Sequence, residues 1–271
     1  QILFDKLELP MIKKRSTAEA VLSELKHKHE LPKLVLEYRK LFKLKNTYLD
    51  PIPTNINPIS NRVHSSFNQT MTATGRLSSS SPNFQNIPIR TEDVKDVRKA
   101  IRAQSPEYQI FSADYSQVEL REMAHLSQNK AQIQALKNGE DLHPFTAKNI
   151  FNIDKDKEVL PEMRRTAKIV NFGIMYGAGP FRLSQELDVP FGEAKKIKDA
   201  YFNKYKGIED YIAKSKLLIK SEKSVQTLLG RKRAVWDSDS QNKIRRDAAE
   251  RMAINMPIQG TAAEMIKICL L

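Results

Sequence analysis

The sequence has few of the groups that build covalent or metal-based frameworks. Its 271 residues include one cysteine, Cys269, which excludes an internal disulfide and a zinc site built from cysteines. Charged residues interrupt every apolar run before it reaches the about 18 residues of a membrane span. The first residues lack the charged-then-apolar order of a secretory signal peptide. We therefore expect a protein of a reducing compartment, the cytoplasm, with no membrane partner.

Acidic residues are scarce relative to basic ones. The chain has 32 acidic and 45 basic residues, and its net charge of +13 is spread over the whole length. A basic protein without any polyanionic partner would show the same balance, so charge alone identifies no ligand. A basic groove for a polyanion is at least as consistent with it.

The first third of the chain changes character twice. Residues 1–50 are predicted to be helical and are rich in lysine. Residues 51–62, PIPTNINPISNR, hold three prolines and three asparagines, so we expect no helix there and place a domain boundary at this stretch. Residues 63–90 are polar and predict hairpins and loops.

The rest of the chain is predicted to be mostly helical. YQIFSADYS, residues 108–116, predicts a buried strand that ends near the carboxylate of Asp114. Helices are predicted from Gln117 to about Lys223. SVQTLLGRKRAVW predicts a short hairpin, and a last helix runs from about Lys243 to the end of the chain.

One predicted helix carries chemistry on a single stripe. In PEMRRTAKIVNFGIMYGAG, Pro161 suits a first helical turn and the Gly-Ala-Gly run ends the helix. Four of its side chains recur every four residues, so each is rotated only about 40° around the helix axis from the one before it. The cations lie near the positive helix N-terminus and could bind a triphosphate, while the aromatic rings could stack on a base. The four are Arg164, Lys168, Phe172 and Tyr176.

Two interpretations of this helix remain open. In the first, the helix binds a nucleotide, and Gly173, which has no side chain, lets a ligand or base pair approach closely. Alternatively, the stripe is an ordinary amphipathic pattern, with cations in solvent and rings in the core.

Four motifs together resemble those of family A DNA polymerases. DYSQVELR, residues 114–121, resembles the family's palm motif, and RRTAKIVNFGIMYG, residues 164–177, resembles the O helix of its fingers. TATGRLSSSSPNFQNIPIR, residues 72–90, and AERMAINMPIQGTAAE, residues 249–264, resemble two further segments in the same order.

This resemblance implies a helix-rich α+β fold with right-hand polymerase architecture, in which an antiparallel sheet forms the palm. Residues 1–62 would be part of the thumb, and residues 63–127 the first part of the palm. Residues 128–224 would form the fingers, and residues 225–271 a second, incomplete part of the palm.

The resemblance also implies catalytic and nucleotide-binding residues. Asp114 would ligate two Mg²⁺ ions, and the backbone carbonyl of Tyr115 would ligate one of them. Glu119 would lie under the sugar and exclude a ribose 2′-hydroxyl, although a surface charge on a helix is the alternative. Tyr176 would occupy the template-base position in an open state. The other implied nucleotide ligands are Gln117, His143, Arg164, Lys168 and Phe172.

Arg164, Lys168 and His143 would hold the triphosphate, and Lys168 would also help pyrophosphate leave. Helix capping is the competing interpretation of His143. Phe172 would pack on the incoming sugar and base.

The implied partners are primer-template DNA and a deoxynucleoside triphosphate, bound by a monomer. The residues implied to contact DNA are Arg76, Asn83, Gln85, Asn86, Arg251, Asn255 and Gln259. Plain structural hydrogen bonding is the alternative for Arg76 and Gln259.

The second carboxylate of a two-metal site is not evident in the sequence. In the family it belongs to a His-Asp-Glu strand after the last helix, and this sequence ends within that helix. We therefore expect DNA and nucleotide binding without turnover by this chain alone. A non-catalytic DNA-binding module and a relative of single-subunit RNA polymerases are the alternatives, and Glu119 and the QNIP stretch argue against the second.

Overall fold

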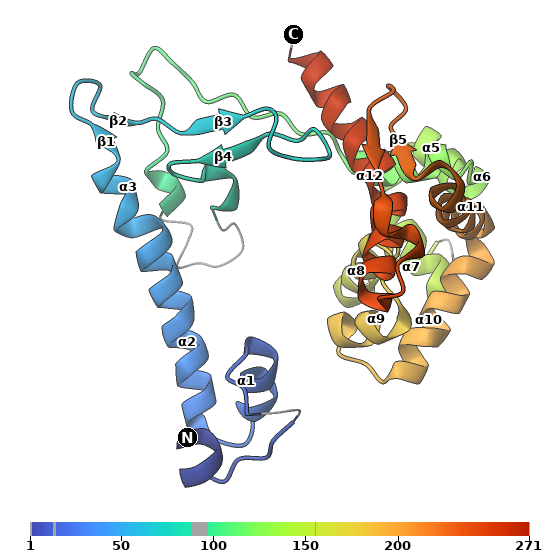
Figure 1. Ribbon diagram of the computed structural model, residues 1–271, viewed down its shortest axis with the longest axis horizontal. Coiled ribbons are helices and arrows are strands. Elements are labelled where there is room, and N and C mark those ends of the chain that lie inside the picture. Colours follow the sequence, from blue (N-terminus) through green and yellow to red (C-terminus); the bar gives the residue numbers. More distant parts are fainter. Residues whose placement is uncertain (1, 13–14, 88–96, 155, 271) are drawn as a thin grey trace. The chain divides into compact units, whose positions relative to one another are not determined.

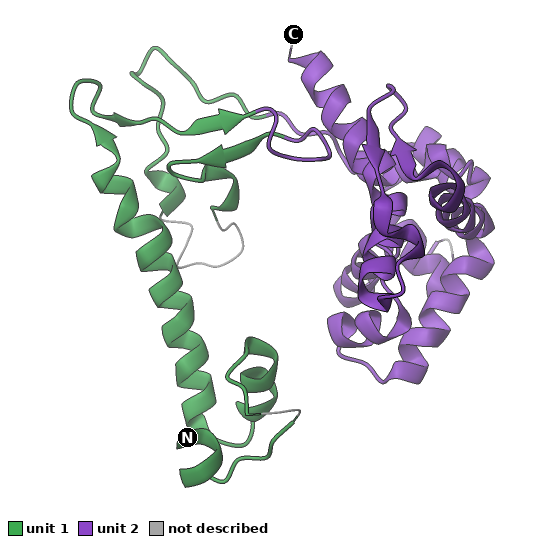
Figure 2. Cartoon of the chain, in the orientation of Figure 1, with its two compact units in different colours: residues 1–68, 77–112 green, residues 69–76, 113–271 purple. Residues whose placement is uncertain are grey.

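The structure, a computed structural model, describes residues 2–12, 15–87, 97–154 and 156–270 (Figure 1). The chain divides into two compact units, which consist of residues 1–68 with 77–112 and residues 69–76 with 113–271 (Figure 2). The predicted thumb, palm and fingers segments divide the chain more finely, so they stay a prediction. Residues 88–96 of the predicted first palm segment lie outside the described residues.

Unit 1 combines helices with small antiparallel hairpins. A small core formed by Leu3, Val21, Leu22 and Leu25 holds the first helices together, as predicted for residues 1–50. Its elements in chain order are η1 (Ile2–Lys6), α1 (Glu19–Leu25), α2 (Glu30–Leu44), η2 (Lys45–Leu49), α3 (Pro51–Thr54), β1 (Ile56–Asn57), β2 (Arg62–Val63), β3 (Ser66–Asn68), β4 (Ser78–Ser80) and η3 (Phe84–Asn86).

The predicted hairpins of residues 63–90 are confirmed in the described part of that range, where β3 pairs with β4 and places Phe67 opposite Ser79. The prediction of no helix in residues 51–62 is wrong for α3. Pro51 occupies the first turn of this helix, where a missing backbone N–H costs no hydrogen bond.

The predicted strand at residues 108–116 is also wrong. The segment is irregular up to Tyr115, and Tyr108, Ile110 and Phe111 are exposed. A strand is stabilised by a paired neighbour, and none of the described strands pairs with this segment. The apolar alternation is therefore present, while the sheet that would bury it is not among the described elements.

Unit 2 is a helical assembly with one hairpin, as predicted from Gln117 onward (Figure 1). Its elements are α5 (Val118–Leu126), α6 (Lys130–Lys137), α7 (Leu142–Ile150), α8 (Pro161–Met175), α9 (Pro180–Leu187), α10 (Phe191–Lys204), α11 (Lys206–Glu222), β5 (Ser224–Gln226), β6 (Lys232–Ala234), η4 (Trp236–Asp239) and α12 (Lys243–Cys269). None of the described helices is long and apolar enough to cross a membrane.

Helix α8 packs into the main core of unit 2. Val170 and Ile174 are fully buried in the same cluster as Leu183 of α9. Gly173 faces this cluster, because a methyl group added to its Cα would lie 2.8 Å from Cδ2 of Leu183. The expectation that Gly173 opens space for a ligand is therefore wrong, and its missing side chain admits α9 instead.

This contact predicts that the effect of Gly173→Ala depends on residue 183. Alanine should gain about 1 kcal/mol of helix propensity, but the clash with Leu183 should cost roughly 1–3 kcal/mol. We expect a net loss of stability in the native sequence. In a Leu183→Ala background the clash is absent, so the same substitution should raise the free energy of unfolding by about 1 kcal/mol. Urea denaturation of the four proteins measures both effects, and equal effects in the two backgrounds would contradict this packing.

Candidate nucleotide and primer-template site

The predicted stripe of Arg164, Lys168, Phe172 and Tyr176 lies along α8 and its C-terminal cap. Arg164 and Lys168 are exposed, while Phe172 and the capping residue Tyr176 are half-buried against the core. The rings of Phe172 and Tyr176 are stacked, with centroids 6.1 Å apart and an interplanar angle of 21°. The helix therefore presents charge at one end and a partly open aromatic surface at the other.

The N-terminus of α7 lies beside the cationic end of α8 and carries Asp141. This carboxylate caps α7 by accepting a hydrogen bond of 2.8 Å from the backbone N–H of His143. It also forms an ion pair of 2.8 Å with Arg164 and accepts a hydrogen bond of 2.7 Å from Gln117. Burial alone would raise the pKa of Asp141, but these hydrogen bonds outweigh it and lower the pKa.

Gln117 connects α5 to the same corner. Its backbone is left-handed, with φ 54° and ψ 36°, at the start of α5. Its side chain makes no cap for α5 and instead accepts a hydrogen bond of 3.2 Å from the backbone N–H of Leu142. Gln117 therefore holds the α7 N-terminus from a second side.

His143 is buried and does not cap its helix. Its side chain is within 3.3 Å of the Asn171 amide, and its ring lies 5.7 Å from that of Phe172. Burial lowers the pKa of His143, the Asp141 carboxylate opposes this, and Arg164 and Lys168 lower the pKa further. The capping role considered for His143 belongs to Asp141.

Glu119 is a buried carboxylate with two donors, which contradicts the surface-charge alternative. Only 8% of the residue is exposed. It accepts a hydrogen bond of 2.7 Å from the Tyr176 hydroxyl and forms an ion pair with Arg76. Burial and the Glu119 carboxylate raise the pKa of Tyr176 to about 12, while Gln259 and Arg76 act in the opposite direction. Arg76, Glu119, Tyr176 and Gln259 thus form one polar cluster.

Three predicted DNA contacts recur every four residues on α12. Arg251 packs against Gly177, whose added methyl group would lie 2.9 Å from Arg251 Cγ and whose φ is +71°. Gln259 interacts with the Tyr176 hydroxyl. Asn255, between them, has a buried side-chain oxygen without a hydrogen-bond partner among the described atoms. This face of α12 therefore lies against the aromatic end of α8.

Three other predicted DNA contacts belong to unit 1. Asn83 accepts a hydrogen bond of 3.0 Å from the backbone N–H of Gln85 and so caps η3. Gln85 donates to the carbonyl of Leu77, 3.1 Å away, and the Asn86 carbonyl accepts from the Tyr48 hydroxyl. All three asparagine and glutamine residues are exposed, and their contact with DNA stays a prediction.

The predicted metal ligands lie in the irregular segment before α5. Asp114 and Tyr115 are both exposed, and the Tyr115 hydroxyl donates a hydrogen bond of 2.6 Å to Sγ of Cys269. This bond raises the pKa of Tyr115. The described residues contain no group of three or more His, Cys, Asp or Glu side chains that could hold a metal ion. They do not by themselves complete a two-metal site.

Comparison with known proteins agrees with these motifs. The family model for DNA polymerase family A matches residues 1–271. The chain belongs to DNA polymerase family A. It is 45% identical to the thermostable DNA polymerase I of Thermus aquaticus over 276 residues, which cover all of this chain and 33% of the relative. It is also 45% identical to DNA polymerase I of Deinococcus radiodurans over 275 residues, or 99% of this chain and 29% of that protein. The chain thus spans about a third of these relatives.

A solved structure of this polymerase family shares the fold. The chain superposes with a TM-score of 0.90 and 39% identity on the POL domain of Pol1 from M. smegmatis, in a complex with DNA primer-template and dNTP. The match covers 100% of this chain and 48% of the other. The predicted fold class, a helix-rich α+β polymerase architecture, is confirmed.

Sequence reasoning about this family member missed Asp141 and Asn171. Both are close to predicted site residues, since Asp141 binds Arg164 and Asn171 contacts His143. An acid directly before Leu-His-Pro is a recognisable helix N-cap signal for Asp141. Asn171 carries no comparable signal, because its contact depends on how α7 packs against α8.

The lowered pKa of His143 predicts a pH dependence of stability. Below the usual histidine pKa of about 6.5, the unfolded chain binds a proton that the folded chain resists. The free energy of unfolding should therefore fall as the pH decreases from about 7 to about 5. His143→Gln should remove part of this slope, and thermal unfolding at several pH values measures it.

Asp141 does not contribute in this window. Because its pKa is lowered on folding, the Asp141 carboxylate stabilises the fold at pH values above its usual pKa of about 3.9, and this stability is lost only at lower pH.

The matched control for His143→Gln is His27→Gln, which replaces an exposed histidine. An unchanged slope in His143→Gln would contradict the assignment.

Proposed function

We propose that this chain is part of a DNA-templated DNA polymerase that adds deoxynucleotides to a primer 3′ end. The observation that carries the proposal is the polarity of α8, which presents Arg164 and Lys168 near its N-terminus and the stacked Phe172 and Tyr176 at its other end. A nucleoside triphosphate has the same polarity, with phosphates at one end and a flat base at the other. Support comes from relatives named DNA polymerase I and a structural neighbour bound to primer-template and dNTP.

The triphosphate is proposed to bind at the cationic end of α8. Arg164 already binds a carboxylate there, because its guanidinium is paired with Asp141. A phosphate oxygen offers the same acceptor geometry and could replace that carboxylate. The exposed Lys168 lies one turn further along, where it would neutralise charge on the departing pyrophosphate. His143 would need to become exposed to reach a phosphate, since only 4% of the residue is exposed in this structure.

The sugar and base are proposed to bind at the aromatic end. Phe172 would pack on the incoming nucleotide, and Glu119 would lie below its sugar. The buried Glu119 cannot easily withdraw, because Arg76 would still pair with its carboxylate after Tyr176 is displaced. A fixed carboxylate would exclude a ribose 2′-hydroxyl by its position. Tyr176 would occupy the template-base position until a nucleotide displaces it, and Gln117 would support the α7 corner beside the nucleotide.

Primer-template DNA is the proposed macromolecular partner. Arg76, Arg251, Asn255 and Gln259 supply donors suited to the minor groove, where acceptors are nearly uniform among base pairs. The net charge of +13 favours phosphate contacts, and Asn83, Gln85 and Asn86 are proposed to add others. Monomeric assembly and a cytoplasmic location are part of the same proposal.

Divalent metal ions, proposed to be two Mg²⁺, would supply electrostatic stabilisation of the attacking and leaving oxygens. Asp114 and the carbonyl of Tyr115 would hold them, but the described residues supply no complete ligand set. The protein's own groups contribute position and charge, with Arg164 and Lys168 orienting the phosphates. We therefore propose that this chain alone binds DNA and nucleotide without turnover.

Primer extension by the full natural protein tests the proposal. Asp114→Ala should lower the extension rate by at least about a hundredfold, because it removes a charge that positions the metal ions. The matched control is Asp237→Ala, which removes another exposed acid of unit 2. Undiminished extension by Asp114→Ala would contradict the assignment. Extension by residues 1–271 alone, with magnesium added, would instead contradict the binding-only proposal for this chain.

A further inference from the structure

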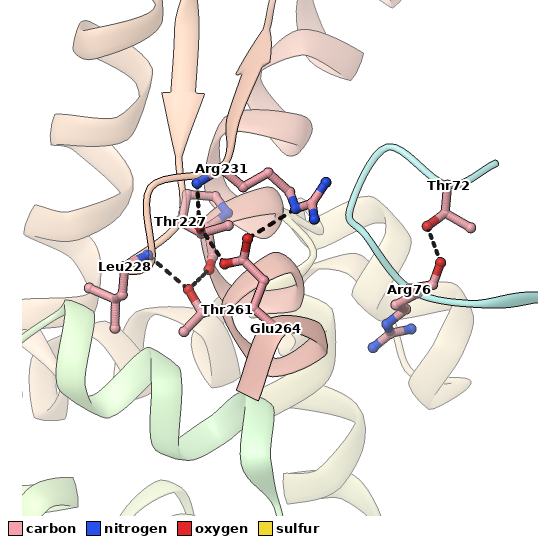
Figure 3. Close-up of polar contacts among 8 residues, drawn as sticks. Thr72, Arg76, Thr227, Leu228, Arg231, Thr261 and Glu264 are labelled. Carbon is pink, nitrogen blue, oxygen red and sulfur yellow. Dashed lines mark hydrogen bonds and ion pairs between the residues drawn. The ribbon is translucent and has the colours of Figure 1, made fainter. Parts of the chain in front are cut away.

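The turn that carries Arg76 is supported by α12, which contains a polymerase-like motif, and by the β5–β6 hairpin, which does not. It is closed by the Thr72 hydroxyl, which donates a hydrogen bond of 2.5 Å to the Arg76 carbonyl (Figure 3). Gly75 within it is buried and has φ +78°, a left-handed conformation that favours glycine. A turn without a side chain at this point can be approached closely by another group.

Arg231 makes that approach from the β5–β6 hairpin. A methyl group added to Gly75 would lie 2.9 Å from both Nε and Cζ of Arg231, so the guanidinium covers the Gly75 backbone. The Arg231 side chain extends from the hairpin toward the turn (Figure 3). Any displacement of Arg231 therefore changes the support of the residue directly before Arg76.

Arg231 is itself fixed by Glu264 of α12. Its Nε lies 3.0 Å from one oxygen of Glu264, whose side chain is only 14% exposed. The other oxygen of Glu264 accepts a hydrogen bond of 2.7 Å from Thr227, and Thr227 accepts one of 3.0 Å from the Arg231 backbone N–H. Both carboxylate oxygens are therefore used, and the arginine is constrained at its backbone and its guanidinium.

Helix α12 supports the same turn at a second point. Gly260 faces both segments, because a methyl group there would lie 2.5 Å from Thr227 Cγ2 and 3.5 Å from the carbonyl oxygen of Thr74. The hairpin tip is tied to this part of α12 by the Thr261 hydroxyl, which accepts a hydrogen bond of 3.1 Å from the backbone N–H of Leu228. The hairpin, α12 and the 72–76 turn thus pack against one another.

We propose that Arg231, fixed by Glu264, is a positioning residue that sets Arg76 toward Glu119. The contacts run without a break from Glu264 through Arg231 and the turn to Arg76, and from there to Glu119 and Tyr176. The proposal rests on the proposed polymerase function, because it assigns Arg231 a role in placing Arg76, a proposed DNA contact that pairs with Glu119. Arg231 touches neither substrate and acts only through Arg76.

A double-mutant cycle in the full natural protein tests this role. Arg231→Ala should lower the single-turnover rate of nucleotide addition by about fivefold to tenfold in the native background. With Arg76→Ala already present, the same substitution should change the rate by less than about twofold. Lys232→Ala removes the same charge from the same hairpin and should have little effect in either background. Glu264→Gln keeps the side-chain shape and should reproduce the Arg231→Ala pattern more weakly, which allows a conclusion even if Arg231→Ala does not fold.

The outcomes distinguish the positioning role of Arg231 from the proposed polymerase function. An Arg231→Ala effect of equal size in both backgrounds, or none in the native one, would overturn the positioning role. Failure of the unsubstituted protein to extend a primer would instead contradict the proposed function. Thermal unfolding of each variant is measured alongside, since a merely structural role would lower stability without making the kinetic effect depend on Arg76.

Discussion

The arrangement of the site depends on the pairing of the buried Glu119 carboxylate with its two donors. A buried charge is tolerated only where other groups satisfy it. Glu119 obtains a cation from Arg76 and a hydroxyl donor from Tyr176, so α5, the 72–76 turn and the end of α8 are fixed relative to one another. Because Gln259 also interacts with Tyr176, α12 belongs to the same set. Each of these segments carries one of the polymerase-like motifs.

A second, separate cluster fixes the other end of α8. Asp141 binds Arg164 and Gln117 while capping α7, and the His143 ring lies 5.7 Å from that of Phe172. The two clusters divide the helix into a cationic half and an aromatic half. This division gives α8 its polarity.

Sequence reasoning succeeded where the signals were local. Pro161 and the Gly-Ala-Gly run marked α8, and the spacing from Arg164 to Tyr176 gave its stripe. It failed where the outcome depended on distant segments. Residues 108–114 alternate like a strand but pair with none of the described strands, and Gly173 faces Leu183 rather than a ligand. The burial of Glu119 and the Arg231–Glu264 pair could not be predicted, because each contact joins segments far apart in the chain.

The competition between deoxynucleotides and ribonucleotides tests the proposed placement of Glu119 below the sugar most directly. Incorporation of dNTP and rNTP by the full natural protein is compared with that of Glu119→Ala. A carboxylate held in place below the sugar predicts that the variant loses at least about tenfold of its preference for dNTP. An unchanged preference would contradict the placement of Glu119 at the sugar.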